Sequence, residues 1–285
     1  MALKTCITNY SFARSLRGGQ MNVEGFCDFC GKAGFEGVDL ISYFWKDKDA
    51  EMKALPKWLG RNKLKLAGYG TRSNFLSHKP EEIEQSFENI RVAIDDARRI
   101  GSKMCRVFGG TSLDGWTMDG ALRQMVESFK KLTPQAEKAG VILTVENHGG
   151  YPATADEVIA VIQGVGSPCF ASLLDTGNFF GVKDEDPLAA AKKLAPWVKH
   201  VHVKDMLKFP VGSGKGHKPA RADYEIQACT IGTGIVENKA IFAALQAAGY
   251  DGYLSIEAEG PETEDEAQRV LTGLANIRKW LKEIG

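Results

Sequence analysis

The sequence predicts an α/β protein with a (β/α)8 barrel, the TIM-barrel architecture, as a single domain over residues 1–285. Three observations predict this fold. Eight short apolar runs, suited to strands buried on both faces, follow one another at a spacing of roughly 30 to 40 residues. Segments with helical periodicity separate these runs, and neither a linker nor a low-complexity stretch interrupts them. A doubly wound open sheet is the alternative, but it would bring its ligand to one switch point, whereas polar residues here end many strands.

The expected strands are runs of apolar and β-branched residues that stop at glycine or at polar residues. In chain order they cover residues 5–11, 37–42, 63–70, 103–110, 141–147, 170–177, 200–205 and 253–259. The clearest helix is expected over residues 79–101, where Ile83, Phe87 and Ile90 recur at spacings of three and four residues. Residues 120–140 and 264–285 repeat this pattern.

Residues 206–237, after the seventh strand, are expected to form the longest irregular loop, because they are rich in Gly, Pro, Lys and Arg. A loop of this length in a compact domain is usually functional or mobile. Its segment GSGKGHK (212–218) lacks the spacing of a nucleotide-binding P-loop. We favour a solvated loop there, with contact between its lysines and an anionic substrate group as the alternative. No GxGxxG motif follows the first strand, so no nicotinamide cofactor is indicated.

Charge and composition exclude several classes of function. Lys and Arg number 36, as do Asp and Glu, so the zero net charge predicts neither a nucleic-acid partner nor a membrane partner. No secretory signal and no membrane-spanning apolar stretch is present, so we expect a cytoplasmic protein. The six scattered cysteines indicate reduced thiols. Cys27 and Cys30 are expected to pack on an amphipathic helix rather than to form a redox or zinc pair.

The ends of the expected strands carry polar residues that suit a metal site. Active sites of (β/α)8 barrels lie where the carboxyl ends of the strands meet the following loops. Carboxylates or a histidine end four consecutive strands, at Glu146, Asp175, His202 and Glu257. Carboxylates gathered in one pocket raise each other's pKa, and a divalent cation removes that penalty. The mainly oxygen-donor set favours Mn²⁺ or Mg²⁺, with Co²⁺, Zn²⁺ or Fe²⁺ as alternatives.

Four motifs at these strand ends resemble one known family. They are TVENHGG (144–150), LLDTGNFF (173–180), VKHVHVKD (198–205) and LSIEAEG (254–260). In this order they resemble the xylose isomerase-like TIM-barrel superfamily, and within it the sugar phosphate isomerase/epimerase-like members. These include ketose 3-epimerases, inosose isomerases and dehydratases, and hydroxypyruvate isomerase. The resemblance covers nearly the whole chain, from GVDL (37–40) to IGTGIV (231–236).

The resemblance implies one divalent metal ion, with Mn²⁺ favoured, and four ligands. These ligands are Glu146, Asp175, His202 and Glu257. His200 competes with His202, and Glu259 with Glu257, because alternation along a strand places each pair on one face. The implied substrate-binding residues are His148, Asn178, Lys204, Asp39 and Trp116.

The implied reaction is a divalent-metal-dependent isomerisation or epimerisation of a sugar or keto-sugar. A carboxylate removes a proton next to a carbonyl, a metal-stabilised enediolate forms, and Glu146 and Glu257 are the expected catalytic acid/base pair. If a hydroxyl group leaves instead, the enzyme is a metal-dependent dehydratase or lyase of a keto-sugar or inosose. An endonuclease IV-like hydrolase is less favoured, because that class needs more than the five histidines present. A non-catalytic sugar-binding barrel is also less favoured.

Two departures from the family pattern weaken the epimerase assignment. Asn178 stands where ketose 3-epimerases carry a histidine, and the family's arginine after the ligand histidine is missing. Lys208 or Arg221 is a candidate to replace that arginine. Aromatic residues in loops after strands form either a wall for a sugar or part of the core; they are Phe44, Trp45, Trp116 and Phe179. The expected partner is a small sugar or polyol, and barrels of this kind often form homodimers.

Overall fold

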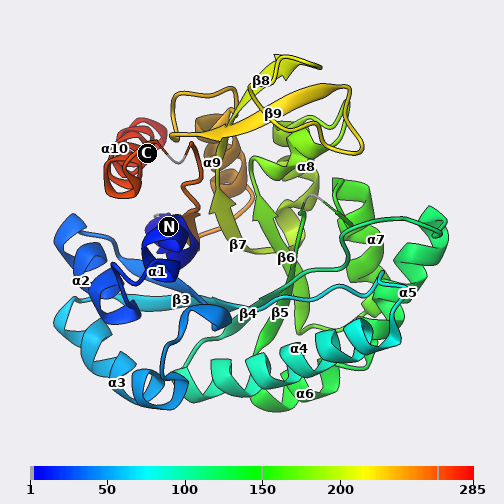
Figure 1. The fold of residues 1–285 in the computed structure, drawn as a ribbon, viewed down its shortest axis with the longest axis horizontal. Helices are drawn as coiled ribbons and strands as arrows, with labels where there is room; N and C mark the ends of the chain where they lie inside the picture. Colours follow the sequence, from blue (N-terminus) through cyan, green and yellow to red (C-terminus); the bar gives the residue numbers. More distant parts are fainter. Residues whose placement is uncertain (1–2, 149, 262) are drawn as a thin grey trace.

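The predicted barrel is confirmed. The computed structural model describes residues 3–148, 150–261 and 263–285. Eight parallel strands close in the order β1-β10-β7-β6-β5-β4-β3-β2 (Figure 1). They are β1 Lys4–Thr8, β2 Gly37–Ile41, β3 Lys65–Gly70, β4 Met104–Val107, β5 Ile142–Glu146, β6 Phe170–Asp175, β7 Val198–Val203 and β10 Tyr253–Ile256. Because β1 pairs with both β2 and β10, the sheet has no free edge.

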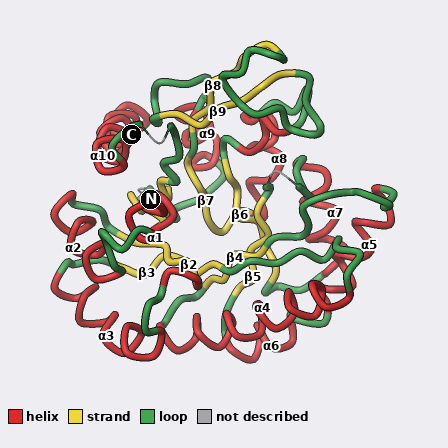
Figure 2. The backbone as a smooth tube through the Cα atoms, viewed as in Figure 1, coloured by secondary structure: helices red, strands yellow, loops and turns green. Residues whose placement is uncertain are grey.

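Helices surround the barrel (Figure 2). They are α1 Ala13–Arg17, α2 Val23–Ala33, α3 Lys48–Arg61, α4 Pro80–Ile100, α5 Met118–Lys130, α6 Thr133–Ala139, α7 Ala155–Val165, α8 Pro187–Leu194, α9 Asn238–Ala247 and α10 Glu266–Ile284, with short 3-10 turns at Asn9–Phe12, Ser42–Phe44, Asn178–Gly181 and Ala195–Trp197. None of the helices in the described part of the chain is long and apolar enough to span a membrane.

The expected helix over residues 120–140 is two helices. α5 ends at Lys130 and α6 begins at Thr133, with a proline in its first turn. That proline is Pro134, which has no N–H to donate and favours the start of a helix over its interior. On α2, Cys27 and Cys30 are buried free thiols, which agrees with a packing role.

The expectation that residues 206–237 are irregular throughout is wrong, because two strands lie within them. β8 (Asp205–Pro210) and β9 (Tyr224–Cys229) form an antiparallel hairpin outside the barrel sheet. Within this segment, the connection between the two strands, residues 211–223, and residues 230–237 after β9 are loops. Figure 1 shows the hairpin at the periphery of the molecule, beyond the ring of barrel strands.

The buried carboxylate of Asp205 connects the two ends of the segment of residues 205–236, which contains the hairpin. One side-chain oxygen of Asp205 accepts hydrogen bonds from the backbone N–H of Met206 and Val236, at 2.9 and 3.0 Å. The other accepts from Gly232 and Gly234, at 2.8 and 3.0 Å. The segment that leads from β9 to α9 is therefore held against the first residues of β8.

The start of α7 offers a test of local stability. The Thr154 hydroxyl accepts from the N–H of Glu157, and the Glu157 carboxylate accepts in return from the N–H of Thr154. We expect Thr154→Ala to lower the free energy of unfolding by about 1 kcal/mol, because the N–H of Glu157 loses the hydroxyl that accepts its hydrogen bond. Urea unfolding followed by circular dichroism measures the change. Thr272→Ala, inside α10, caps no helix and should not destabilise the protein. Equal effects of the two substitutions would contradict the capping role.

Candidate metal centre

Three carboxylates and one imidazole meet at the carboxyl ends of four barrel strands. Glu146 ends β5, Asp175 ends β6, His202 lies near the end of β7 and Glu257 follows β10. One ligand atom from each lies within 4.8 Å of those of the others, and all four residues are buried. The four residues expected to share a metal therefore come together, although they are far apart in sequence.

The neighbours of His202 orient its ring. Its Nε2 lies 3.0 Å from Oδ2 of Asp39, which leaves Nδ1 facing the carboxylates. Nδ1 lies 2.7 Å from Oε2 of Glu257 and 3.8 Å from Oε1 of Glu146. A carboxylate behind a histidine is a common support for a metal-binding imidazole, since it fixes the tautomer and the direction of the free nitrogen.

Two buried atoms of this group have no hydrogen-bond partner among the described residues. They are Nδ1 of His202, whose approach to Glu257 at 2.7 Å lacks hydrogen-bond geometry, and Oδ2 of Asp175, which has only an ion-pair contact with the Lys204 ammonium at 3.4 Å. An unpaired buried polar atom is costly, and a cation between these atoms would remove the cost. The residues present therefore fit a divalent metal ion, both in donor chemistry and in the direction of their free atoms.

The carboxylates respond differently to their surroundings. Burial raises the pKa of Asp175 to about 7; Lys204 opposes this rise, and the charges of Glu146 and Glu257 add to it. Burial alone would also raise the pKa of Glu146, but His202 and then Arg106 hold it at about 2. The pKa of Glu257 is likewise lowered, by Lys204 and His202 against the effect of burial. The expected mutual repulsion is thus visible at Asp175, while basic neighbours offset it at the two glutamates.

Arg106 and Asn178 hold Glu146 from two sides. Nη1 of Arg106 lies 3.3 Å from Oε2 of Glu146, and both side chains are buried, so the arginine is an ion-pair partner inside the barrel. Nδ2 of Asn178 donates to Oε1 of the same glutamate at 3.2 Å. The amide that replaces the family's histidine therefore contacts the carboxylate expected to act as acid or base.

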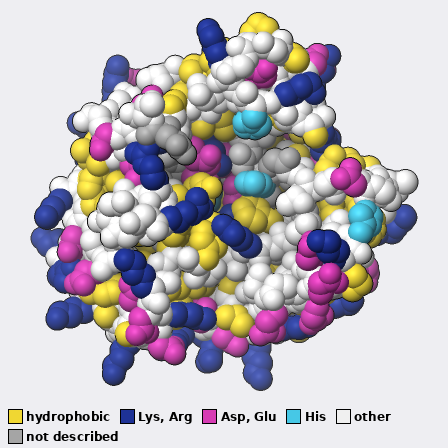
Figure 3. Space-filling model, viewed as in Figure 1, with side chains coloured by type: hydrophobic (Ala, Val, Ile, Leu, Met, Phe, Trp, Pro, Cys, Tyr) yellow, Lys and Arg dark blue, Asp and Glu magenta, His cyan; other side chains and the backbone are white. Residues whose placement is uncertain are grey.

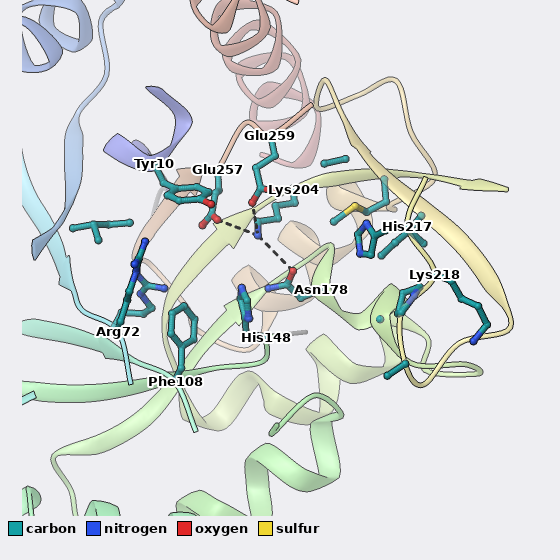
Figure 4. Close-up of a pocket in the computed structure, with 18 of the residues that line it drawn as sticks. Tyr10, Arg72, Phe108, His148, Asn178, Lys204, His217, Lys218, Glu257 and Glu259 are labelled. Atoms are coloured by element: carbon teal, nitrogen blue, oxygen red, sulfur yellow. Dashed lines mark hydrogen bonds and ion pairs between the residues drawn. The ribbon is translucent and has the colours of Figure 1, made fainter. Parts of the chain in front are cut away.

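Lys204 connects the group to the mouth of the barrel (Figure 4). Its ammonium lies 3.0 Å from Glu257 and from Glu259, and 3.4 Å from Asp175. Burial alone would lower the pKa of Lys204, but these carboxylates raise it well above its usual value, so the side chain is charged. Glu259 is thereby paired with Lys204 and lies outside the ligand group, which favours Glu257 as the ligand.

Asp39, which was expected to contact the substrate, is buried inside the barrel beside His200. Oδ2 of Asp39 is 2.9 Å from Nε2 of His200, and the carboxylate is almost fully buried. Burial alone would raise the pKa of Asp39, but His200 and His202 hold it below its usual range. Asp39 does not line the cavity, so its position favours support of His202 over contact with a substrate. His200 joins Asp39 and lies outside the carboxylate group, which favours His202 as the ligand.

A cavity of about 610 Å³ opens above the carboxylates. In Figure 3 it is the central hollow, where acidic and histidine side chains are visible. Of the expected substrate residues, His148, Asn178 and Lys204 line it. The ring of His148 packs against Phe108, with centroids 4.5 Å apart. This volume suits a molecule of the size of a sugar.

Trp116 does not line this cavity. Its Nε1 donates to the backbone oxygen of Leu76, and its ring stacks on His78, so the side chain closes a loop outside the site. Neither proposed replacement for the family's arginine reaches the cavity. Arg221 forms a two-point ion pair with Glu157, and Lys208 lies over the ring of Tyr224.

None of the four aromatic residues considered for a sugar wall lines the cavity, so the alternative of core or loop packing holds for them. Phe44 and Phe179 are buried in the core, and Trp45 donates to the hydroxyl of Tyr69. The cavity is lined instead by aromatic and basic residues that follow the first four strands, namely Tyr10, Tyr43, Arg72 and Phe108. All four residues directly follow a strand. That position predicts a place in the cavity only when the fold shows that the strands end at the same face.

Comparisons with known proteins agree with this geometry. The family model described as xylose isomerase-like TIM barrel matches residues 27–283. Inosose dehydratase from Lacticaseibacillus casei is 28% identical over 258 residues, which are 85% of this chain and 84% of that protein. Inosose dehydratase from Clostridium perfringens (strain ATCC 13124) is 29% identical over 267 residues, covering 88% of this chain and 86% of that protein.

Solved structures share the fold at lower identity. The structure of L-ribulose 3-epimerase aligns with a TM-score of 0.76 and 19% identity, over 99% of this chain and 95% of the other. The structure of the IOLI protein with a binding zinc atom aligns with a TM-score of 0.79 and 15% identity, over 99% of both chains. At these identities, the similarity extends to the fold.

Proposed function

Because the chain belongs to the xylose isomerase-like TIM-barrel family, we propose that it is a metal-dependent enzyme that removes a proton next to the carbonyl of a sugar or keto-sugar. The favoured outcome is isomerisation or epimerisation. The observation that carries the proposal is the convergence of Glu146, Asp175, His202 and Glu257 beneath a polar cavity. We further infer that the enzyme acts in the cytoplasm, and a homodimer is compatible with the family.

The four converging residues are the proposed ligands of one divalent ion, and the donor set favours Mn²⁺. When bound, such an ion supplies a Lewis acid for the carbonyl oxygen and a neighbouring hydroxyl. Glu146 and Glu257 are the proposed acid and base, which remove the proton from one carbon and return it elsewhere. Asn178 and Arg106 position Glu146, while Lys204 positions Glu257. His148 and Phe108 flank the substrate in the cavity.

Dehydration of a keto-sugar or inosose is the second candidate. Two observations favour it: the sequence relatives named above are inosose dehydratases, and Asn178 replaces the histidine of ketose 3-epimerases. The first step is the same, since a proton next to the carbonyl is removed before the hydroxyl group leaves. In this candidate Lys204, which is charged and lines the cavity, is placed to contact the departing oxygen.

The test measures the shared step first. The protein, supplied with Mn²⁺, is incubated in D₂O with a panel of ketoses and keto-inositols, and deuterium at the carbon next to the carbonyl is followed by NMR. We expect incorporation into at least one compound. A product with a shifted carbonyl or inverted carbon identifies an isomerase or epimerase, and a product lacking water identifies a dehydratase. Absence of exchange across the panel, with metal bound, would refute the proposed function.

A further inference from the structure

Two arginines beside the cavity are not used by the proposed chemistry. Arg72 follows β3 and lines the cavity above the carboxylates. Arg17 ends α1 and lines an adjacent cavity of about 840 Å³, which shares Tyr10, His217 and Glu259 with the first. Both arginines are solvent-exposed, and Figure 3 shows dark blue side chains gathered on one side of the central hollow.

The two guanidinium groups pack on one aromatic cluster. Arg72 lies 4.0 Å from the ring centroid of Tyr43, and Arg17 lies 5.7 and 5.8 Å from those of Tyr10 and Phe44. Phe44 contacts both tyrosines: its ring centroid lies 4.8 Å from that of Tyr43 and 6.4 Å from that of Tyr10. Stacking on aromatic faces orients a guanidinium while leaving its N–H groups free for a planar or tetrahedral anion.

The backbone that carries Arg72 is fixed. Thr71 and Ser73, on either side of it, are buried, with 4% and 7% of their surfaces exposed. The N–H of Thr71 donates to the backbone oxygen of Arg106, and the hydroxyl of Ser73 donates to that of Phe108. Arg72 is therefore an exposed cation on a rigid segment, which lowers the conformational cost of binding a ligand.

Charge balance separates these arginines from the two buried cations of the cavity, Arg106 and Lys204. Arg106 faces Glu146, and Lys204 faces three further carboxylates, Asp175, Glu257 and Glu259. The excess of negative charge in this group is what a divalent ion would neutralise. In the described part of the chain, no carboxylate is within ion-pair distance of Arg17 or Arg72, so their charges remain for a ligand.

Building on the proposed function, we propose that Arg17 and Arg72 bind an anionic group, a phosphate ester or a carboxylate, at the end of the substrate remote from the reacting carbonyl. Guanidinium groups suit both anions, because their N–H donors match two oxygens at once. The substrate class is then an acidic derivative of a ketose. Lys218 lines the opposite side of the cavity in Figure 4 and is assigned no part in this subsite.

The experiment compares three substrates that differ only at carbon 6: a 2-ketohexose with a hydroxyl, a carboxylate or a phosphate ester there. We expect the protein to prefer one of the two anions over the neutral ketose in kcat/KM, and the preferred anion identifies the group. Arg72→Gln and Arg17→Gln should each reduce kcat/KM for that anion about 10- to 100-fold, mainly through KM, with little change for the neutral ketose. Arg123→Gln, an exposed arginine on α5, is the matched control.

Three results would overturn the subsite. They are equal use of the neutral and anionic ketoses, equal loss on all three substrates in the arginine variants, or loss of the preference in Lys218→Gln instead. Calorimetric titration with the 6-phosphate and 6-carboxylate ketoses keeps the subsite testable if no ketose reacts. If the unmodified protein binds an anionic ketose and the variant with both Arg17→Gln and Arg72→Gln does not, the subsite is supported even where the reaction proposal fails. The subsite is refuted if the unmodified protein binds neither anionic ketose, or if it and the double variant bind them equally.

Discussion

Replacing Glu146 with glutamine is expected to lower kcat/KM by roughly 10²- to 10⁴-fold, the range for losing a general acid or base. The amide keeps the shape of the side chain and can still contact Asn178. It cannot accept the proton, however, and it removes a negative charge from the proposed metal site. The substitution should therefore also lower the metal content of the purified protein, which mass spectrometry of the metal measures alongside turnover.

The control for this variant is Glu88→Gln, which changes an exposed glutamate on α4. It should match the unmodified protein in turnover and in metal content. Thermal unfolding of both variants separates lost chemistry from lost folding, because Arg106 in the Glu146 variant keeps its charge without its carboxylate partner. Unchanged turnover in Glu146→Gln would remove this residue from the acid/base pair.

Replacing Asp205 with alanine is expected to lower the free energy of unfolding by about 3 kcal/mol. The carboxylate accepts four backbone N–H groups, and an unsatisfied buried donor costs roughly 1–3 kcal/mol. The total is smaller than four full penalties, since the segment of residues 230–236 can open to water once released. Urea unfolding measures the loss.

Asp223→Ala provides the comparison, because Asp223 pairs with Lys183 at an exposed site. Such pairs contribute roughly 0–1 kcal/mol, so this variant should stay close to the unmodified protein. Asp205→Asn should fall between the two alanine variants, because the amide retains one accepting oxygen. Similar stabilities for Asp205→Ala and Asp223→Ala would show that the buried hydrogen bonds contribute little.

The barrel could be predicted from the sequence because its strands are buried on both faces. β2 and β6 are buried at every position, and most of their residues are apolar, so both strands are recognisable from the sequence. β8 and β9 escaped prediction because the hairpin lies outside the barrel. Only the first two positions of β8 are buried, two positions of β9 are half-exposed, and the strands flank a loop rich in glycine. The Gly, Pro, Lys and Arg content of residues 206–237 predicts a loop more strongly than their residue alternation predicts strands.

The proposed ligand group could be predicted because parallel strands end at one face. The residues that contact those ligands could not be predicted from the sequence. Asp39 contacts His200 and His202, which lie on a distant strand of the barrel. The spacing of these residues in the sequence does not predict that contact. For Trp116, the competing partner was the backbone oxygen of Leu76. An aromatic residue in a loop after a strand carries no signal that distinguishes a substrate wall from a closed loop.

The hairpin of β8 and β9 has a consequence for how relatives of this protein can diverge. Its connection contributes His217 and Lys218 to the cavity, yet the carboxylates beneath belong to the barrel strands. Since Asp205 joins the two ends of residues 205–236, we expect this segment to be exchangeable as one unit. Evolution, or an engineer grafting this segment from a homologue, can reshape which molecules are accepted while the reaction machinery is inherited intact.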